Sequence, residues 1–209
     1  MKILLIGATG MVGSRILNEA LSRGHTVTAA VRDPARLPAH PAVTPVALDM
    51  TSAAEVIPQA QAGDVIISAV SPRNSDDAVA DALAFTESLI AVQQATGKRL
   101  LMVGGGSSLN MPDGSSALDA APKAILPEAT GMRRAYARLV AADTDFAVLA
   151  PGGMIAPGER TGTFRLSGRT MLTDDTGGPS QISAEDFAIA MLDEVETPSH
   201  FRTIFNVAY

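Results

Sequence analysis

Three features of the 209-residue sequence predict an α/β fold, with a doubly wound parallel sheet, helices on both faces and a single domain. Apolar strand segments alternate with helical segments up to residue 103, and parallel strands joined by helices require right-handed crossovers that cover both faces. Hydrophobic residues make up 46% of the chain and charged residues 18%, which is typical of a packed globule. No linker divides the sequence, so we expect residues 151–209 to cover the carboxyl edge of the sheet.

The N-terminal half can be assigned from its periodicity. Residues 2–6 are a short apolar run typical of a buried strand. Apolar side chains at helical spacing from Met11 to Ser22 predict a helix that Gly24 ends. Strands are then expected at 26–31, 43–48, 64–70 and 99–103, and helices at 53–60 and 76–96. Gly97 is the expected C-cap of the second of these helices.

The C-terminal half has longer irregular segments. Residues 104–127 are rich in Gly, Ser, Asp and Pro and predict a long loop, a feature that usually has a functional role in a compact domain. We then expect a helix at 128–142, a strand at 146–150, loop with short strand pieces at 152–178, a helix at 184–195 and a strand at 203–207. Ser183 is a credible N-cap, with Asp186 closing a capping-box-like turn.

Composition excludes several classes of function. The formal net charge of −6 argues against a protein that binds nucleic-acid backbones. The absence of cysteine excludes thiolate chemistry and cysteine-ligated metals, and the three histidines lack metal-ligand spacing. No apolar run approaches the length of a membrane span, and the N-terminal segment does not fit a signal peptide. We therefore expect a cytoplasmic protein without metal, membrane or nucleic-acid partners, and the oligomeric state stays open.

The strongest chemical signal is the segment GATGMVG at residues 7–13, directly after the first strand. Gly7 permits the tight turn, Gly10 lets a pyrophosphate approach the backbone, and Gly13 lets the helix pack closely on the strand. Thr9, Met11 and Val12 belong to the same turn, where free N–H groups and the helix dipole favour phosphate. The alternative interpretation is a tight turn that binds no ligand.

The end of the second strand indicates which nicotinamide cofactor is bound. NAD-binding domains place an acidic residue about twenty residues after the glycines, to bind the ribose 2′-hydroxyl. Here the strand ends at Val31 and Arg32 without a carboxylate. Arg32, assisted by Arg36, can instead clamp a 2′-phosphate, which favours NADP(H) over NAD(H). Alternatively, Arg32 is a surface residue that pairs with Asp33.

Other cofactor contacts are expected where strands end. Asp49 can accept a hydrogen bond from the adenine amino group, and Met50 lies alongside the ring. The fourth strand ends at the point where ribose and phosphates pass, and the fifth and sixth strands end near the nicotinamide. The corresponding residues are Ala69, Val70, Ser71, Gly104, Pro151 and Gly152. Each position is equally compatible with an ordinary strand terminus.

Together with AAVRDPARL at 29–37, PGERTG at 157–162 and ISAEDFAIAMLDE at 182–194, the glycine segment carries a family resemblance over essentially the whole chain. The sequence resembles atypical short-chain dehydrogenases/reductases of the NmrA-like, NAD(P)H-binding family. Within that family it is most similar to NADH-flavin reductases and biliverdin-IXβ-reductase-like proteins. The resemblance implies a Rossmann-like domain that passes hydride from NAD(P)H to a planar acceptor, such as a flavin (FMN or FAD) or a quinone.

The candidate catalytic residues depart from the usual pattern. Ordinary short-chain dehydrogenases use a Tyr-x-x-x-Lys pair, but Tyr136 is followed four residues later by Val140. Ser107 and Ser108 follow the fifth strand, where related reductases place a hydroxyl near the nicotinamide. For the two serines the alternative is loop capping, and for Tyr136 it is packing. The Glu159–Arg160 pair could reach an anionic substrate or form a surface salt bridge.

The missing lysine is compatible with two functions. Hydride transfer to a flavin or quinone needs mainly stacking, orientation and exclusion of water, because the cofactor carries the chemistry. A reductase of planar acceptors is therefore the favoured interpretation. A non-catalytic NADP(H)-binding redox sensor of the NmrA type is the alternative, and turnover of NADPH with a planar acceptor distinguishes the two.

Overall fold

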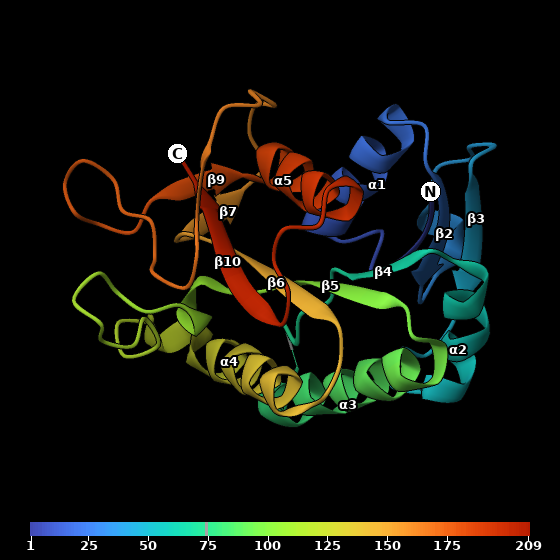
Figure 1. Cartoon of the computed structure of the whole chain (residues 1–209), viewed down its shortest axis with the longest axis horizontal. Helices are drawn as coiled ribbons and strands as arrows, with labels where there is room; N and C mark the ends of the chain where they lie inside the picture. The colour runs from blue at the N-terminus through green and yellow to red at the C-terminus, as the bar shows by residue number, and fades with distance from the viewer. Residues whose placement is uncertain (74) are drawn as a thin grey trace.

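A computed structural model describes residues 1–73 and 75–209 (Figure 1). Its main sheet has eight strands in the described part of the chain, in the order β3-β2-β1-β4-β5-β6-β10-β8. The strands are β1 (Lys2–Ile6), β2 (Thr26–Val31), β3 (Val43–Ala47), β4 (Val65–Ser68), β5 (Arg99–Val103), β6 (Phe146–Pro151), β8 (Arg165–Ser167) and β10 (Thr203–Ala208). A small separate sheet pairs β7 (Met154–Ala156) with β9 (Gln181–Ser183).

The strand order confirms the doubly wound α/β class. From β1 the chain proceeds through β2 and β3 in one direction, and then continues from β4 on the other side of β1. The carboxyl ends of β1 and β4 therefore border the topological switch point, where open α/β sheets bind ligands. Helices α1 (Met11–Ser22) and α5 (Ala184–Glu196) cover one face, and α2 (Ala53–Ala62), α3 (Ala78–Thr96) and α4 (Leu126–Ala141) cover the other (Figure 1).

Two hydrophobic clusters, one on each face, hold the sheet between the helix layers. Adjacent residues of β1 point to opposite clusters: Leu4 packs with Phe146 and α3, whereas Leu5 packs with Phe205, α1 and α5. Both clusters combine residues from the N-terminal and C-terminal parts of the chain. Strands buried on both faces read as near-continuous apolar runs, which is why the sequence made them easy to recognise.

Several element boundaries differ from the prediction for local reasons. The strand expected at 64–70 is confined to Val65–Ser68, although the Ala69 N–H still donates to the Ile6 carbonyl of β1 at 2.9 Å. Helix α3 begins at Ala78 rather than at residue 76, because the carboxylate of Asp77 caps it by accepting from the Ala80 N–H at 3.0 Å. The predicted C-cap is confirmed at Gly97, which has a φ of 66°. The remaining strand and helix ends either coincide with the prediction or differ from it by one or two residues.

Two features go beyond the expectation. The sheet is parallel from β3 to β10, as predicted, and β8 adds one antiparallel strand at its edge. The segment 104–127 is not simply a loop: it contains the short 3-10 helices η2 (Gly106–Ser108) and η3 (Lys123–Ile125), and α4 already begins at Leu126. Within the described residues, no helix is both long enough and apolar enough to cross a lipid bilayer.

Candidate functional site

The glycine turn lies at the switch point, between the end of β1 and the start of α1. Gly7 has a φ of +85°, and its N–H donates to the Ala30 carbonyl of β2 at 2.9 Å. A Cβ on Gly7 would lie 2.9 Å from the Ala69 oxygen at the end of β4. A Cβ on Gly13 would lie 2.0 Å from the Gly7 oxygen. Both positions therefore require glycine on steric grounds alone.

The first turn of α1 is built to receive an anion. Gly10 is the N-cap and provides no side-chain cap, and among the described residues no partner is found for the N–H groups of Met11, Val12 and Gly13. The first turn of α1 contains no acidic residue, whereas the first turns of α2, α3, α4 and α5 each contain at least one. Unpartnered N–H groups and an uncompensated helix dipole attract phosphate, so the chain fits a diphosphate here.

Arg32 and Arg36 follow β2, and Arg36 lines a cavity that adjoins this turn. Arg32 is exposed, and within the described chain it makes no ion pair. Asp33, its suggested partner, instead caps a 3-10 helix, η1 (Pro34–Arg36), by accepting from the Ala35 N–H at 3.1 Å. Arg36 and Thr9 both line a cavity of about 220 Å³. The surface position that the alternative gave to Arg32 agrees with the structure, but the described residues show no pair with Asp33.

Asp49 and Met50 follow β3 on the same side of the sheet. One carboxylate oxygen of Asp49 accepts from the N–H and the hydroxyl of Thr51, at 2.9 and 2.7 Å. These hydrogen bonds, led by the one from the Thr51 side chain, hold the pKa of Asp49 below its usual range. Met50 is half-buried against the core. The turn occupies one oxygen of Asp49 and leaves the second one available as an acceptor.

The ends of β4, β5 and β6 continue the same edge. Ala69 donates its N–H to the Ile6 carbonyl at 2.9 Å, next to the half-buried Val70 and the exposed Ser71. A Cβ on Gly104 would lie 2.5 Å from a methyl of Val148, so strand packing alone accounts for that glycine. Farther along the edge, a Cβ on Gly106 would lie 3.1 Å from the oxygen of Pro151 and 3.5 Å from that of Gly153, so η2 packs against residues 151–153, which include Gly152.

The three candidate catalytic residues do not form a hydrogen-bonded unit. Ser108 is 1% exposed and Ser107 is half-buried, both in η2. Tyr136 on α4 is 8% exposed, and its ring packs edge-on against Phe146 with centroids 6.5 Å apart. In residues 1–73 and 75–209, no hydrogen bond joins these three hydroxyls to one another or gives the Tyr136 hydroxyl a partner. The geometry therefore shows Tyr136 mainly as a packing residue.

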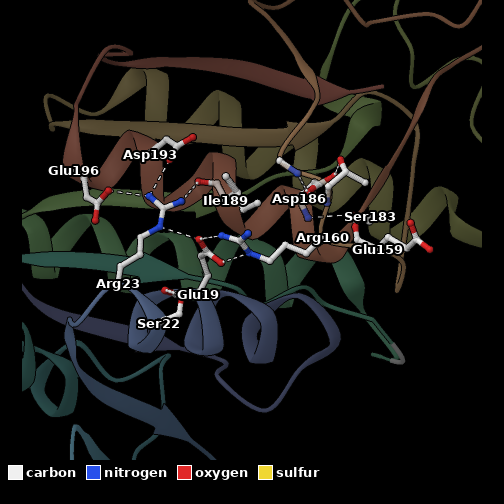
Figure 2. A network of polar contacts seen from close by, with 12 residues as sticks. Glu19, Ser22, Arg23, Glu159, Arg160, Ser183, Asp186, Ile189, Asp193 and Glu196 are labelled. Atoms are coloured by element: carbon white, nitrogen blue, oxygen red, sulfur yellow. Dashed lines mark hydrogen bonds and ion pairs between the residues drawn. The ribbon is translucent and has the colours of Figure 1, made fainter.

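Within the Glu159–Arg160 pair, the side chain of Arg160 has a structural role. Figure 2 shows Arg160 reaching across to α1, where its Nε and Nη2 donate to Glu19 at 2.9 and 3.0 Å. Glu19 is 5% exposed and also binds Arg23 at 2.8 Å, and the hydrogen bond from Arg160 is the main cause of its lowered pKa. The salt-bridge interpretation of Arg160 is confirmed, because its guanidinium is engaged by a buried carboxylate.

Asp186 anchors the same loop and departs from the predicted capping box. Ser183 does cap α5, since its Oγ accepts from the Asp186 N–H at 3.0 Å. The carboxylate of Asp186, however, does not reach back to the Ser183 N–H, which donates to the Tyr209 hydroxyl at 3.2 Å. It accepts instead from the N–H groups of Thr161 and Gly162 and from the hydroxyls of Thr161 and Tyr209. The prediction that the Asp186 side chain closes a capping box is therefore wrong, whereas the N-cap at Ser183 is confirmed.

Sequence reasoning missed three polar residues beyond β5. Asn206 on β10 is fully buried, and its amide holds the segment after β8 through hydrogen bonds to three backbone carbonyls. Arg133 on α4 donates to the Ser107 carbonyl at 3.0 Å, and Arg169 lies over the Tyr136 ring, 5.6 Å from its centroid. Asn206 could have been noticed in the sequence, because it is a polar residue within an apolar strand. The sequence around Arg133 and Arg169 contains no comparable signal.

Comparisons with known proteins agree with this geometry. A family model described as NAD(P)H-binding matches residues 7–198. YwnB of Bacillus subtilis, an uncharacterized protein, is 32% identical over 99% of this chain and 98% of its own length. A candidate epimerase from Bacteroides thetaiotaomicron has a TM-score of 0.90 and 36% identity, covering 100% of this chain and 96% of that chain. A candidate NADH-flavin reductase from Streptococcus pneumoniae has a TM-score of 0.87 and 27% identity, covering 100% of this chain and 99% of that chain.

Proposed function

This chain belongs to the NAD(P)H-binding family, and from that premise we propose that it is a reductase that passes hydride from NADPH to a planar acceptor. The observation that carries the proposal is the uncapped, acid-free first turn of α1 behind the glycine turn, located at the switch point. The similarity to a candidate NADH-flavin reductase supports a flavin or a quinone as the acceptor.

Each part of the strand edge has a role in this proposal. The N–H groups of Met11, Val12 and Gly13 bind the diphosphate, and Asp49 accepts from the adenine amino group. Ala69, Val70 and Ser71 form the floor beneath the ribose and phosphates. Gly104, Pro151 and Gly152 border the nicotinamide, with Ser107 and Ser108 beside it. The bound dinucleotide supplies the hydride, while these residues bind it, orient it and exclude water.

The direct test is turnover. Purified protein is mixed with NADPH and either FMN, riboflavin or a quinone, and the absorbance of the reduced nicotinamide is followed. We expect NADPH to be consumed only when both the protein and an acceptor are present. Tight binding of NADP(H) by calorimetry without turnover of any acceptor would instead indicate the redox sensor. If neither NADPH nor NADH bound at all, both interpretations would be wrong.

The preference for NADP(H) rests on Arg32. Substitution Arg32→Ala removes a guanidinium that can bind the 2′-phosphate, so NADPH affinity should fall by about 1.5–3 kcal/mol, or roughly 10- to 150-fold. NADH has no 2′-phosphate, and its affinity should stay nearly unchanged. Titration calorimetry with both cofactors checks this. An equal loss of affinity for NADPH and NADH would show that Arg32 does not recognise the 2′-phosphate.

Tyr136 is expected to contribute little to turnover. Its hydroxyl has no partner in the described part of the chain, and hydride transfer to a flavin does not need a positioned proton donor there. We expect Tyr136→Phe to keep kcat within about threefold of the wild type, because the ring packing is retained. Steady-state kinetics with FMN measure this. A loss of about 100-fold or more would assign Tyr136 an acid–base role after all.

A further inference from the structure

Two arginines beside the loop after β5 have no carboxylate partner among the described residues. Arg133 donates its Nη1 to the carbonyls of Ser107 and Leu109, at 3.0 and 3.4 Å. The guanidinium carbon of Arg169 lies 5.6 Å from the centroid of the Tyr136 ring. Neither forms an ion pair within residues 1–73 and 75–209, although Arg138, also on α4, pairs with Glu87. Within this described part of the chain, two positive charges next to Ser107 and Tyr136 are therefore not paired with a carboxylate.

The position of Arg169 is fixed by its surroundings. The buried amide of Asn206 donates to the carbonyls on either side of Arg169, those of Gly168 at 2.6 Å and Thr170 at 2.9 Å. The Arg169 carbonyl itself accepts from the Asn110 N–H at 3.0 Å. Figure 1 shows the two loops involved, which follow β5 and β8, extending from the same end of the molecule. An exposed guanidinium on a pinned backbone is preorganised to bind an anion.

These arginines lie next to the part of the edge assigned to the nicotinamide. A Cβ on Gly106 would lie 3.1 Å from the Pro151 oxygen and 3.6 Å from the Met171 side chain, so the two loops meet at the carboxyl ends of β5 and β6. Met171 in turn donates its N–H to the Asn110 carbonyl at 2.8 Å. An acceptor stacked over the nicotinamide therefore has its periphery near Arg133 and Arg169.

We infer that Arg133 and Arg169 form an anion subsite for the acceptor, so that the acceptor carries a phosphate or carboxylate outside its ring system. This inference rests on the proposed function and narrows its substrate class. Arginine suits the role because its fork of N–H donors matches the oxygens of both groups. Arg133 keeps N–H donors beyond its backbone contacts, and Arg169 uses none of its own in a described hydrogen bond.

FMN and riboflavin provide a matched pair, since they share the isoalloxazine ring and differ by one phosphate. Quenching of flavin fluorescence by the NADP⁺-loaded protein measures binding, and NADPH oxidation measures turnover. We expect FMN to bind at least about tenfold more tightly than riboflavin, as for one charge-assisted contact. A naphthoquinone carboxylate and its methyl ester, tested by displacement of FMN and by turnover, form a second pair that separates carboxylate from phosphate recognition.

Substitutions distinguish a specific contact with Arg169 from a general effect of positive charge. Arg169→Gln should reduce the FMN preference to less than about twofold, and Arg169→Lys should keep part of it because the charge remains. Arg134→Gln is the matched control: it removes the same charge from the exposed neighbouring position of α4, and the preference should persist. Thermal melting checks that each variant is folded.

The possible results are distinguishable. If FMN binds and reacts no better than riboflavin, and the naphthoquinone carboxylate no better than its methyl ester, the proposed anion subsite is wrong. The reductase proposal stands in that case, because the acceptors are still reduced. The subsite is equally wrong if Arg169→Gln weakens both flavins alike, or if none of the four compounds binds. An FMN preference that depends on Arg169 but comes without NADPH turnover would support the subsite and contradict the reductase.

Discussion

The Gly13→Ala variant is expected to lose both stability and cofactor affinity. The added Cβ would lie 2.0 Å from the Gly7 oxygen, which belongs to the backbone and cannot rotate away as a flexible side chain could. Either α1 moves off β1 or the glycine turn opens, and overpacking of this kind costs about 3 kcal/mol. Because the chain has 209 residues, we expect the melting temperature to fall by about 6–12 °C.

The same displacement should disrupt binding of the diphosphate. The N–H groups of Met11, Val12 and Gly13 open α1, so they move with it. Loss of two hydrogen bonds to a charged group corresponds to about 3–6 kcal/mol, which is a hundredfold or greater loss of NADPH affinity. Denaturant unfolding and calorimetry measure the two effects.

Gly168→Ala provides the control for this variant. Nothing lies within 4 Å of a Cβ at Gly168, and its backbone is not in the left-handed region. It should retain both the stability and the NADPH affinity of the wild type. If Gly13→Ala behaved like this control, the turn would not be as tightly packed as its geometry indicates, and the cofactor proposal would lose its structural basis.

The layout of the fold could be predicted because its signals are local. Residues 2–6 are an apolar run and residues 26–31 a β-branched run, and the bounds observed for β1 and β2 are the ones that the sequence predicted. The helical spacing of 11–22 likewise defined α1. Boundaries shifted where a single side chain intervened, as when Asp77 capped α3.

The parts of the fold that could not be predicted depend on distant contacts. Strand β8 has three residues in a glycine-rich segment, and it exists because it pairs with β10 about forty residues later. The amide of Asn206 then organises the chain after β8, a role that no spacing in the sequence announces. The structure of β8 and of the segment after it therefore depends on pairing with distant residues, which local sequence propensity does not reveal.

The candidate site likewise has a part that local sequence predicts and a part that depends on distant contacts. The glycine turn combines a strand, a turn and a helix within a short segment, so its chemistry could be read directly. Arg160 could not be interpreted alone, because its partner Glu19 lies 141 positions away. Arg133 and Arg169 became candidates only when the fold showed that neither pairs with a carboxylate in the part of the chain that the structure describes.

Loss of the Asp186 carboxylate is expected to cause the second large effect. Asp186 is fully buried and receives four hydrogen bonds, of which the Thr161 and Gly162 N–H groups share one oxygen at 2.8 and 2.9 Å. The hydroxyls of Thr161 and Tyr209 share the other oxygen, at 2.6 and 3.0 Å. We expect Asp186→Ala to reduce the free energy of unfolding by about 3 kcal/mol, since it leaves several donors without acceptors.

The two oxygens predict a graded result. In Asp186→Asn the remaining oxygen can face the two N–H groups, while the new amide N–H₂ faces hydroxyls that can rotate to accept. We therefore expect Asp186→Asn to lose only about half as much stability as Asp186→Ala. Denaturant unfolding measures the loss, and hydrogen exchange should show faster exchange at the Thr161 and Gly162 amides.

Asp174 supplies a matched control, because its carboxylate also accepts from loop N–H groups and a threonine hydroxyl but is exposed to solvent. Water can replace the Asp174 carboxylate, so Asp174→Ala should leave the melting temperature nearly unchanged. A drop as large as that of Asp186→Ala would show that burial is not what makes the Asp186 contacts important.

The pH dependence provides an independent check of Asp186. Burial raises the pKa of its carboxyl, but the hydrogen bonds from Thr161, Gly162 and Tyr209 outweigh burial and hold it below the usual range. A carboxylate with a depressed pKa in the folded state stabilises the protein above its unfolded pKa, about 3.9, and this contribution disappears as the pH falls through the folded value. The stability difference between the wild type and Asp186→Asn should therefore be constant from pH 5 to 8 and shrink below about pH 3.9. A difference that does not change with pH would mean that the ionised form of Asp186 contributes nothing.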